Sequence, residues 1–216
     1  MRASRTAFVI DGFNVYHSLV DASRTLGLPD EGGTKWLNLS GLCESYLPVF
    51  GTEATLAGVH YFSALAHHLE STHPGITARH ELYVQVLKGT GVSVELGRFK
   101  KKLIPCHACR KTIKRYEEKE TDVALAAKLL EIFALDQADR VVLVTGDTDI
   151  APAVRTAKRL YPEKEVCFAF PWKRKHAELE TLVTTSISIT REAYLRHQLP
   201  DMVVVGTKTF WKPLTW

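Results

Sequence analysis

Hydrophobic positions along the chain follow two periods, one typical of buried strands and one typical of amphipathic helices. Short apolar runs predict strands at residues 7–11, 56–64, 92–99, 141–144 and 166–170. Apolar residues at helical spacing predict helices at residues 13–26, 39–49, 76–88, 118–135, 150–160 and 177–183. Because strands alternate with helices of this length, we expect an α/β protein with a parallel central sheet flanked by helices.

The composition suits one globular domain with a full core, since 45% of the 216 residues are hydrophobic and 24% are charged. We expect this domain to span residues 1–197, with a basic insertion at about 98–117 and a tail, 198–216, that packs on the domain or on a partner. No apolar run approaches the roughly 20 residues of a membrane-spanning helix. The N-terminus has no signal-peptide core, so we expect a cytoplasmic protein without a membrane partner.

Aspartates follow two of the predicted strands at the point where each strand ends. Asp11 ends the first strand in DGFN, and Asp147 and Asp149 follow the strand at 141–144 in TGDTD, while Asp122 lies at the entry to a predicted helix. Each aspartate alone is explained by a turn or a helix cap. Open α/β sheets, however, bind ligands at the carboxyl ends of their strands, so together the four predict one acidic crevice.

Crowded carboxylates repel one another, and each raises the pKa of its neighbours. A hard divalent cation removes that penalty, and Mg²⁺ or Mn²⁺ prefers oxygen ligands from carboxylates and substrate phosphates. The chemistry that fits such a site is hydrolysis of a phosphodiester by a metal-activated water. The sequence therefore predicts a Mg²⁺ or Mn²⁺ site at this edge of the sheet.

Basic residues are concentrated in the insertion, where eight cations lie between residues 98 and 115 with no acidic residue among them. Because the whole chain has a net charge of +4, the remainder without these eight is acidic. A local basic patch of this kind indicates a polyanion such as RNA, although a solvated surface face is the common alternative. The expected phosphate contacts are Lys100, Lys101, Lys102, Arg110, Lys111, Lys114 and Arg115.

A second basic segment, PWKRKH at residues 171–176, follows the last strong predicted strand. Trp172 would stack on an unpaired base, and Lys173, Arg174 and Lys175 would hold backbone phosphates, as in proteins that bind single strands. The alternative is a loop whose tryptophan packs on the body of the domain.

The pair Cys106 and Cys109, in CHAC, has the spacing of a zinc knuckle but supplies two of the four ligands that a structural site needs. The alternative is a surface loop with two thiols. The sequence does not choose among the residues that would complete a zinc site, which are Cys43, His60, His67, His68, His80 and His107.

Three segments resemble, in order and spacing, the bacterial NYN-domain proteins of the PIN-like nuclease superfamily. They are DGFN at 11–14, TDVALA at 121–126 and VTGDTDIAPAV at 144–154, and the resemblance covers roughly residues 6–196. It implies a three-layer α/β/α Rossmann-like fold and a metal-dependent ribonuclease whose acidic cluster matches Asp11, Asp122, Asp147 and Asp149. Asn14 matches the family's polar residue beside the first aspartate and would position a carboxylate, a water or a phosphate.

The resemblance also suggests supporting residues. Many PIN-like members carry a glutamate near the position of Asp122, so Glu118, one turn earlier in the predicted helix, is a further candidate ligand. Thr145 or Thr148 would support the last aspartates by hydrogen bonding.

We therefore predict a metal-dependent endoribonuclease that binds RNA, single-stranded or in structured loops, and that forms a homodimer or meets an inhibitory partner. One alternative is an RNA-binding module without catalysis. Another is a phosphatase of the haloacid dehalogenase type, but that chemistry needs an aspartate two residues after Asp11, where this chain has Phe13.

Overall fold

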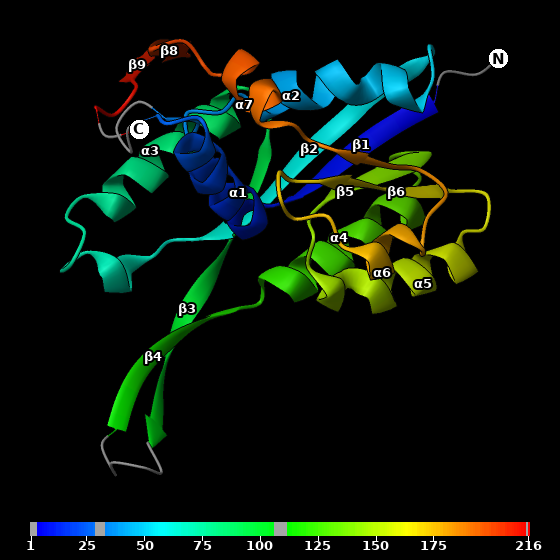
Figure 1. Cartoon of the computed structure of the whole chain (residues 1–216). Coiled ribbons are helices and arrows are strands. Elements are labelled where there is room, and N and C mark those ends of the chain that lie inside the picture. The colour runs from blue at the N-terminus through cyan, green and yellow to red at the C-terminus, as the bar shows by residue number, and fades with distance from the viewer. Residues whose placement is uncertain (1–3, 29–32, 106–111, 215) are drawn as a thin grey trace.

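The computed structural model describes residues 4–28, 33–105, 112–214 and 216. It confirms an α/β protein with a mostly parallel seven-stranded sheet flanked by helices, in the strand order β4-β3-β2-β1-β5-β6-β7 (Figure 1). Every neighbouring pair in this sheet is parallel except β3 and β4. The strands are β1 (Ser4–Asp11), β2 (Ala54–Ala64), β3 (Ser93–Pro105), β4 (Thr112–Lys119), β5 (Arg140–Val144), β6 (Glu165–Phe170) and β7 (Ser186–Ser188).

Helices cover both faces of the sheet, as Figure 1 shows. They are α1 (Gly12–Thr25), α2 (Leu39–Tyr46), α3 (Ile76–Gly89), α4 (Thr121–Ala134), α5 (Ala151–Leu160), α6 (Ala177–Glu180) and α7 (Arg191–Arg196). In β1, Phe8 and Ile10 face the core under α1, α2, α3 and α7, whereas Ala7 and Val9 face the core under α4, α5 and α6. The central strand is thus buried on both faces, which explains its nearly continuous apolar sequence.

The basic insertion is a β-hairpin, since β3 continues beyond residue 99 and pairs with β4 (Figure 1). This corrects the prediction that a helix begins at residue 118. Glu118 lies in β4 opposite Phe99, Glu120 adopts a left-handed conformation with φ of 82°, and α4 begins only at Thr121. Cross-strand pairing therefore prevails over helix propensity in this segment. This edge of the sheet is a long hairpin, which projects from the body of the protein in Figure 1.

Two other predicted helices are shorter than expected. The helix predicted at 39–49 ends at Tyr46 and continues as a 3-10 turn, Leu47–Phe50, because Pro48 cannot donate a helical hydrogen bond. The helix predicted at 177–183 ends at Glu180. No helix in the described ranges is long and apolar enough to cross a membrane.

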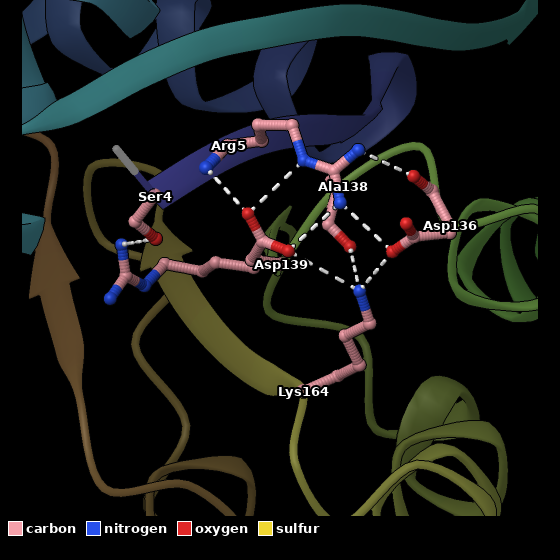
Figure 2. Close-up of polar contacts among 7 residues, drawn as sticks. Ser4, Arg5, Asp136, Ala138, Asp139 and Lys164 are labelled. Atoms are coloured by element: carbon pink, nitrogen blue, oxygen red, sulfur yellow. Dashed lines mark hydrogen bonds and ion pairs between the residues drawn. The ribbon is translucent and has the colours of Figure 1, made fainter. Parts of the chain in front are cut away.

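A charged network fixes the amino ends of the central strands, at the edge opposite the predicted crevice (Figure 2). The Arg5 side chain donates to both Asp139 oxygens, from Nε at 3.1 Å and from Nη2 at 2.9 Å, and the Arg5 backbone N–H donates to Oδ2 at 3.0 Å. Lys164 bridges Asp136 at 2.6 Å and Asp139 at 3.3 Å. The start of β1 is thereby joined to the loops before β5 and β6.

The tail forms a small antiparallel hairpin, β8 (Met202–Val205) and β9 (Lys208–Trp211), beside α3 (Figure 1). The terminal Trp216 ring packs 5.3 Å from Tyr83 and 6.2 Å from Trp36, between ring centroids. Trp211, in contrast, is 63% exposed.

Candidate active site

The order in which the chain adds strands to the sheet reverses between β1 and β5. From β1 the chain adds β2 and β3 on one side and then crosses to add β5, β6 and β7 on the other. A crevice at the carboxyl ends of the strands is expected at such a switch point. Asp11 is the last residue of β1, and Thr145 to Asp149 follow β5 directly. Two of the three predicted acidic segments are therefore adjacent through strand pairing.

Hydrogen bonds connect the ends of these two strands. The buried Asp11 carboxylate accepts from the backbone N–H of Asn14 at 3.0 Å and from the Thr145 hydroxyl at 2.8 Å. The same hydroxyl accepts from the backbone N–H of Asp147 at 3.0 Å. Asp11 thus caps α1 and is also held in place by the loop after β5.

A second set of contacts shapes the TGDTD loop. Asn14 Oδ1 accepts from the Gly146 N–H at 3.1 Å, and Asp147 Oδ1 accepts from the Asp149 N–H at 3.0 Å. A Cβ on Gly146 would lie 1.9 Å from the carbonyl oxygen of Arg174, so only glycine fits beneath the loop after β6. Through its hydrogen bond from the Gly146 N–H, the Asn14 side chain positions the backbone of the TGDTD loop.

Neighbouring carboxylates contribute to raised pKa values of two aspartates in this region. Burial raises the pKa of Asp11, and the charge of Asp147 adds to this increase. Hydrogen bonds from Asn14 and Thr145 lower the pKa but do not cancel the increase. The pKa of Asp122 is raised by loss of hydration and then by Asp147, Asp11 and Asp149. The effects on Asp122, at the start of α4, show that it lies close enough to the two strand ends to interact with their charges.

Glu118 reaches this neighbourhood from β4 rather than from a helix. Its carboxylate accepts from the Thr121 hydroxyl, and its pKa is raised to about 7 by burial, with Asp11 and Asp122 adding to the shift. In the described part of the chain, none of these five carboxylates forms an ion pair with Lys, Arg or His.

The donor set suits a hard divalent cation, since every candidate donor is a carboxylate oxygen. The side chains do not close around a common point, because no three His, Cys, Asp or Glu residues in the described ranges form a group that could hold a metal ion. Asp11 and Asp147 direct oxygens at the backbone N–H groups that they cap. The structure thus brings the carboxylates into one region without assembling a finished coordination sphere.

The hairpin carries the basic residues on exposed strands. Lys102 pairs with Glu117 at 2.8 Å, and Arg98 pairs with Glu120 at 2.5 Å, so acidic residues in β4 and directly after it neutralise part of the charge that the sequence pattern indicated. Four exposed cations have no ion-pair partner among the described residues: Lys100, Lys101, Lys114 and Arg115. The predicted contacts Arg110 and Lys111, and the zinc candidates Cys106, His107 and Cys109, lie outside the described residues.

The segment 171–176 packs on the body of the domain. Trp172 lies against the core, with the Arg191 guanidinium 5.7 Å above its ring centroid, and its backbone carbonyl accepts from Ser18. This supports the packing alternative, because a ring already covered on the protein has little free face for a base. Arg174 pairs with Asp21 at 2.6 Å and Lys175 with Glu180 at 2.7 Å, and Lys173 donates to Thr25.

Two features of the site were not predicted. Tyr61, at the carboxyl-end half of β2, is buried beside Asp11 and Glu118, whose charges add to the effect of burial in raising its pKa to about 12. Gly12 has no room for a Cβ, since one would lie 2.5 Å from the Phe62 carbonyl oxygen. In the sequence, only the Asp11-Gly12 dipeptide indicated that a glycine is required at this position.

Comparison with solved structures finds chains that are similar to this one. A protein of unknown function from Vibrio parahaemolyticus is 20% identical, with a TM-score of 0.56 over 88% of this chain and 94% of that one, and thus shares the fold. A deacetylase of teicoplanin biosynthesis is 12% identical, with a TM-score of 0.33 over 76% of this chain and 68% of that one. A UDP-N-acetylglucosamine 2-epimerase from Listeria monocytogenes, described as putative, is 14% identical, with a TM-score of 0.35 over 91% of this chain and 43% of that one. No curated protein matches significantly.

The family comparison is more informative. The model of the NYN domain matches residues 61–190, which is more than half of the chain. The matched segment includes Asp122, Asp147 and Asp149, whereas Asp11 and Asn14 precede it. The chain therefore belongs to the NYN domain family of the PIN-like nuclease superfamily.

Proposed function

We propose that this protein is a ribonuclease that hydrolyses RNA phosphodiester bonds with the help of Mg²⁺ or Mn²⁺. The observation that carries the proposal is the group of Asp11, Glu118, Asp122, Asp147 and Asp149 at a topological switch point, without an ion-paired cation among the described residues. Burial, with the charges of neighbouring carboxylates, raises the pKa of Asp11, Glu118 and Asp122. Such uncompensated charge is typical of a site that awaits a cation. Membership of the NYN family supports nuclease chemistry.

Asp11, Asp122, Asp147 and Asp149 are the proposed metal ligands, with Glu118 as a further one. A bound cation would neutralise this group and supply a Lewis acid for a phosphoryl oxygen. The chain's own residues position these donors: Thr145 and Asn14 hold the ends of β1 and β5 together, and the Asp147 carboxylate is oriented by the Asp149 N–H. The carboxylates would have to shift towards one another for the site to close.

The hairpin is the proposed RNA-binding element. Lys100, Lys101, Lys114 and Arg115 are exposed, and they would contact phosphates without reading sequence. We further propose that the sheet and its helices form the Rossmann-like, three-layer fold of PIN-like nucleases, as one domain with the hairpin as an insertion. A zinc knuckle at Cys106 and Cys109 remains a proposal that zinc analysis of the purified protein would test.

One assay tests the proposed activity. Labelled RNA would be incubated with the protein in Mn²⁺, in Mg²⁺ or in excess EDTA, with a small phosphomonoester in parallel. We expect internal cleavage that depends on the divalent ion and no release of phosphate from the monoester. Cleavage that persists in EDTA would contradict metal dependence, phosphate release would favour the phosphatase, and RNA binding without cleavage would favour a non-catalytic module.

A further inference from the structure

Six rings form a continuous row from α1 to the base of the β3–β4 hairpin, which we call the aromatic ladder. Centroid separations between successive rings are 5.6 Å for Tyr16–His17, 6.3 Å for Phe13–His17, 5.6 Å for Phe13–Phe99, 4.5 Å for His68–Phe99 and 4.3 Å for His68–Tyr116. His68 and Tyr116 are stacked almost parallel, with 14° between their planes. Tyr16 and Tyr116, at the two ends, are 40% and 41% exposed.

The ladder lies where two surface pockets meet. The larger pocket, about 550 Å³, reaches from Tyr16 to Gly12 and Tyr61, next to Asp11. The smaller one, about 420 Å³, reaches Arg98 and Tyr116 at the base of the hairpin. His68 and Phe99 line both pockets, so the two hollows are adjacent, one at the base of the basic hairpin and the other beside Gly12, which follows Asp11 in the chain.

The lining of these two pockets suits a polyanion that carries flat rings. Among the described residues, no Asp or Glu lines either pocket, and the larger one is bordered by Arg24, Lys35 and Arg79. Exposed aromatic faces beside cations are the recurrent means by which proteins hold unpaired bases and their phosphates. A duplex would not use these rings, because its bases are stacked on one another and present only their edges.

We infer that the aromatic ladder is a stacking platform for the bases of single-stranded RNA and leads the strand from the hairpin to the acidic edge. The inference rests on the proposed nuclease function and adds to it a binding site for unpaired bases, formed by the six rings. Tyr16 and Tyr116 stack on bases at the two ends, while Arg24, Arg79 and the hairpin lysines contact phosphates.

Binding measured in excess EDTA tests this inference without cleavage. The probe is a labelled RNA strand of about ten nucleotides, compared with a blunt duplex of the same sequence and with a strand whose central positions lack bases. We expect the unmodified strand to bind more tightly than either of the others. The double variant Tyr16→Ala/Tyr116→Ala should lose about tenfold or more in affinity for the strand, because base stacking at both ends of the ladder is removed.

Four controls separate stacking from other causes. Tyr16→Phe/Tyr116→Phe keeps both rings and should bind as the wild type does, whereas Trp211→Ala removes an exposed ring outside both pockets and should have no effect. Thermal unfolding shows whether the double variant is folded. The slope of log affinity against log salt should stay unchanged in the double variant, because no phosphate contact is lost.

Equal affinity for strand, duplex and base-free strand, or full affinity in the folded double variant, would overturn the inference and would mean that the rings only fix the hairpin to the body. This outcome is distinct from failure of the proposed function. A protein that cleaves RNA without ring-dependent binding disproves the ladder alone, and one that binds strands through the rings without cleaving them disproves the nuclease alone.

Discussion

The hydroxyl of Thr145 donates to the carboxylate of Asp11 at 2.8 Å, and this bond joins the end of β5 to the end of β1. Both side chains are buried, at 2% and 4% exposure. Because the hydroxyl also accepts from the Asp147 N–H, one side chain orients two of the proposed metal ligands.

Thr145→Val should therefore lower stability and reduce cleavage together. The substitution keeps the shape of the side chain but removes a donor to a buried carboxylate, which costs about 1–3 kcal/mol in the free energy of unfolding. The pKa of Asp11, already raised by burial, should rise further. Urea unfolding and the RNA assay provide the measurements. Thr145→Ser, which retains the hydroxyl, is the matched control, and wild-type stability in the valine variant would contradict the assigned role.

Asp147→Asn should abolish cleavage while leaving the fold and most RNA affinity in place. The amide oxygen of asparagine can still accept from the Asp149 N–H, so the cap of the 3-10 turn at Thr148–Ile150 persists. The variant lacks one anionic ligand, which weakens cation binding more than phosphate contacts. Cleavage rate, RNA affinity and melting temperature would be compared with those of Asp201→Asn, an exposed position near the tail. Full activity of Asp147→Asn would refute the ligand assignment.

Asp139→Ala should destabilise the protein more than Asp136→Ala. Asp139 accepts three hydrogen bonds from Arg5 and one from Lys164, and these contacts hold its pKa well below the usual range. The Asp136 side chain is 67% exposed, so its ion pairs are screened by solvent and contribute less to stability. Urea unfolding of the two single variants would decide the order, and equal losses would count against the structural role of Asp139.

Stability should fall as the pH drops from about 6.5 to about 4, in part because of His80. Burial lowers the pKa of His80 to about 4 from 6.5, so in this range the unfolded chain binds a proton that the folded chain does not. The stabilising effect of neutral His80 is fully present above about pH 6.5, and the loss of unfolding free energy relative to that level is no more than about 3 kcal/mol near pH 4. Unfolding free energies at about pH 7 and about pH 5 should differ less in His80→Gln than in the wild type. His176→Gln, on an exposed position, is the control, and an unchanged difference in His80→Gln would rule out the linkage.

The order of strands and helices could be predicted from local pattern because burial on both faces forces nearly continuous apolar runs, as in Val141 to Val144. The placement of Asp11 and Asp147 followed for the same reason, since both residues come directly after such runs. The hairpin could not be found in this way. Its strands are exposed and charged, and their pairing, such as Lys102 opposite Arg115, depends on contacts between segments rather than on a periodic pattern.

The sequence by itself determined the α/β class, the acidic residues at the strand ends and the local concentration of basic residues, because each depends on neighbours along the chain. Only the tertiary structure decided which distant groups meet. In the structure, Thr145 donates to Asp11, and Glu118 lies in a strand rather than in the predicted helix. Arg191 lies over the Trp172 ring, and Phe99 contacts both Phe13 and His68. These contacts arise from the packing of segments far apart in sequence, and no local period encodes that packing.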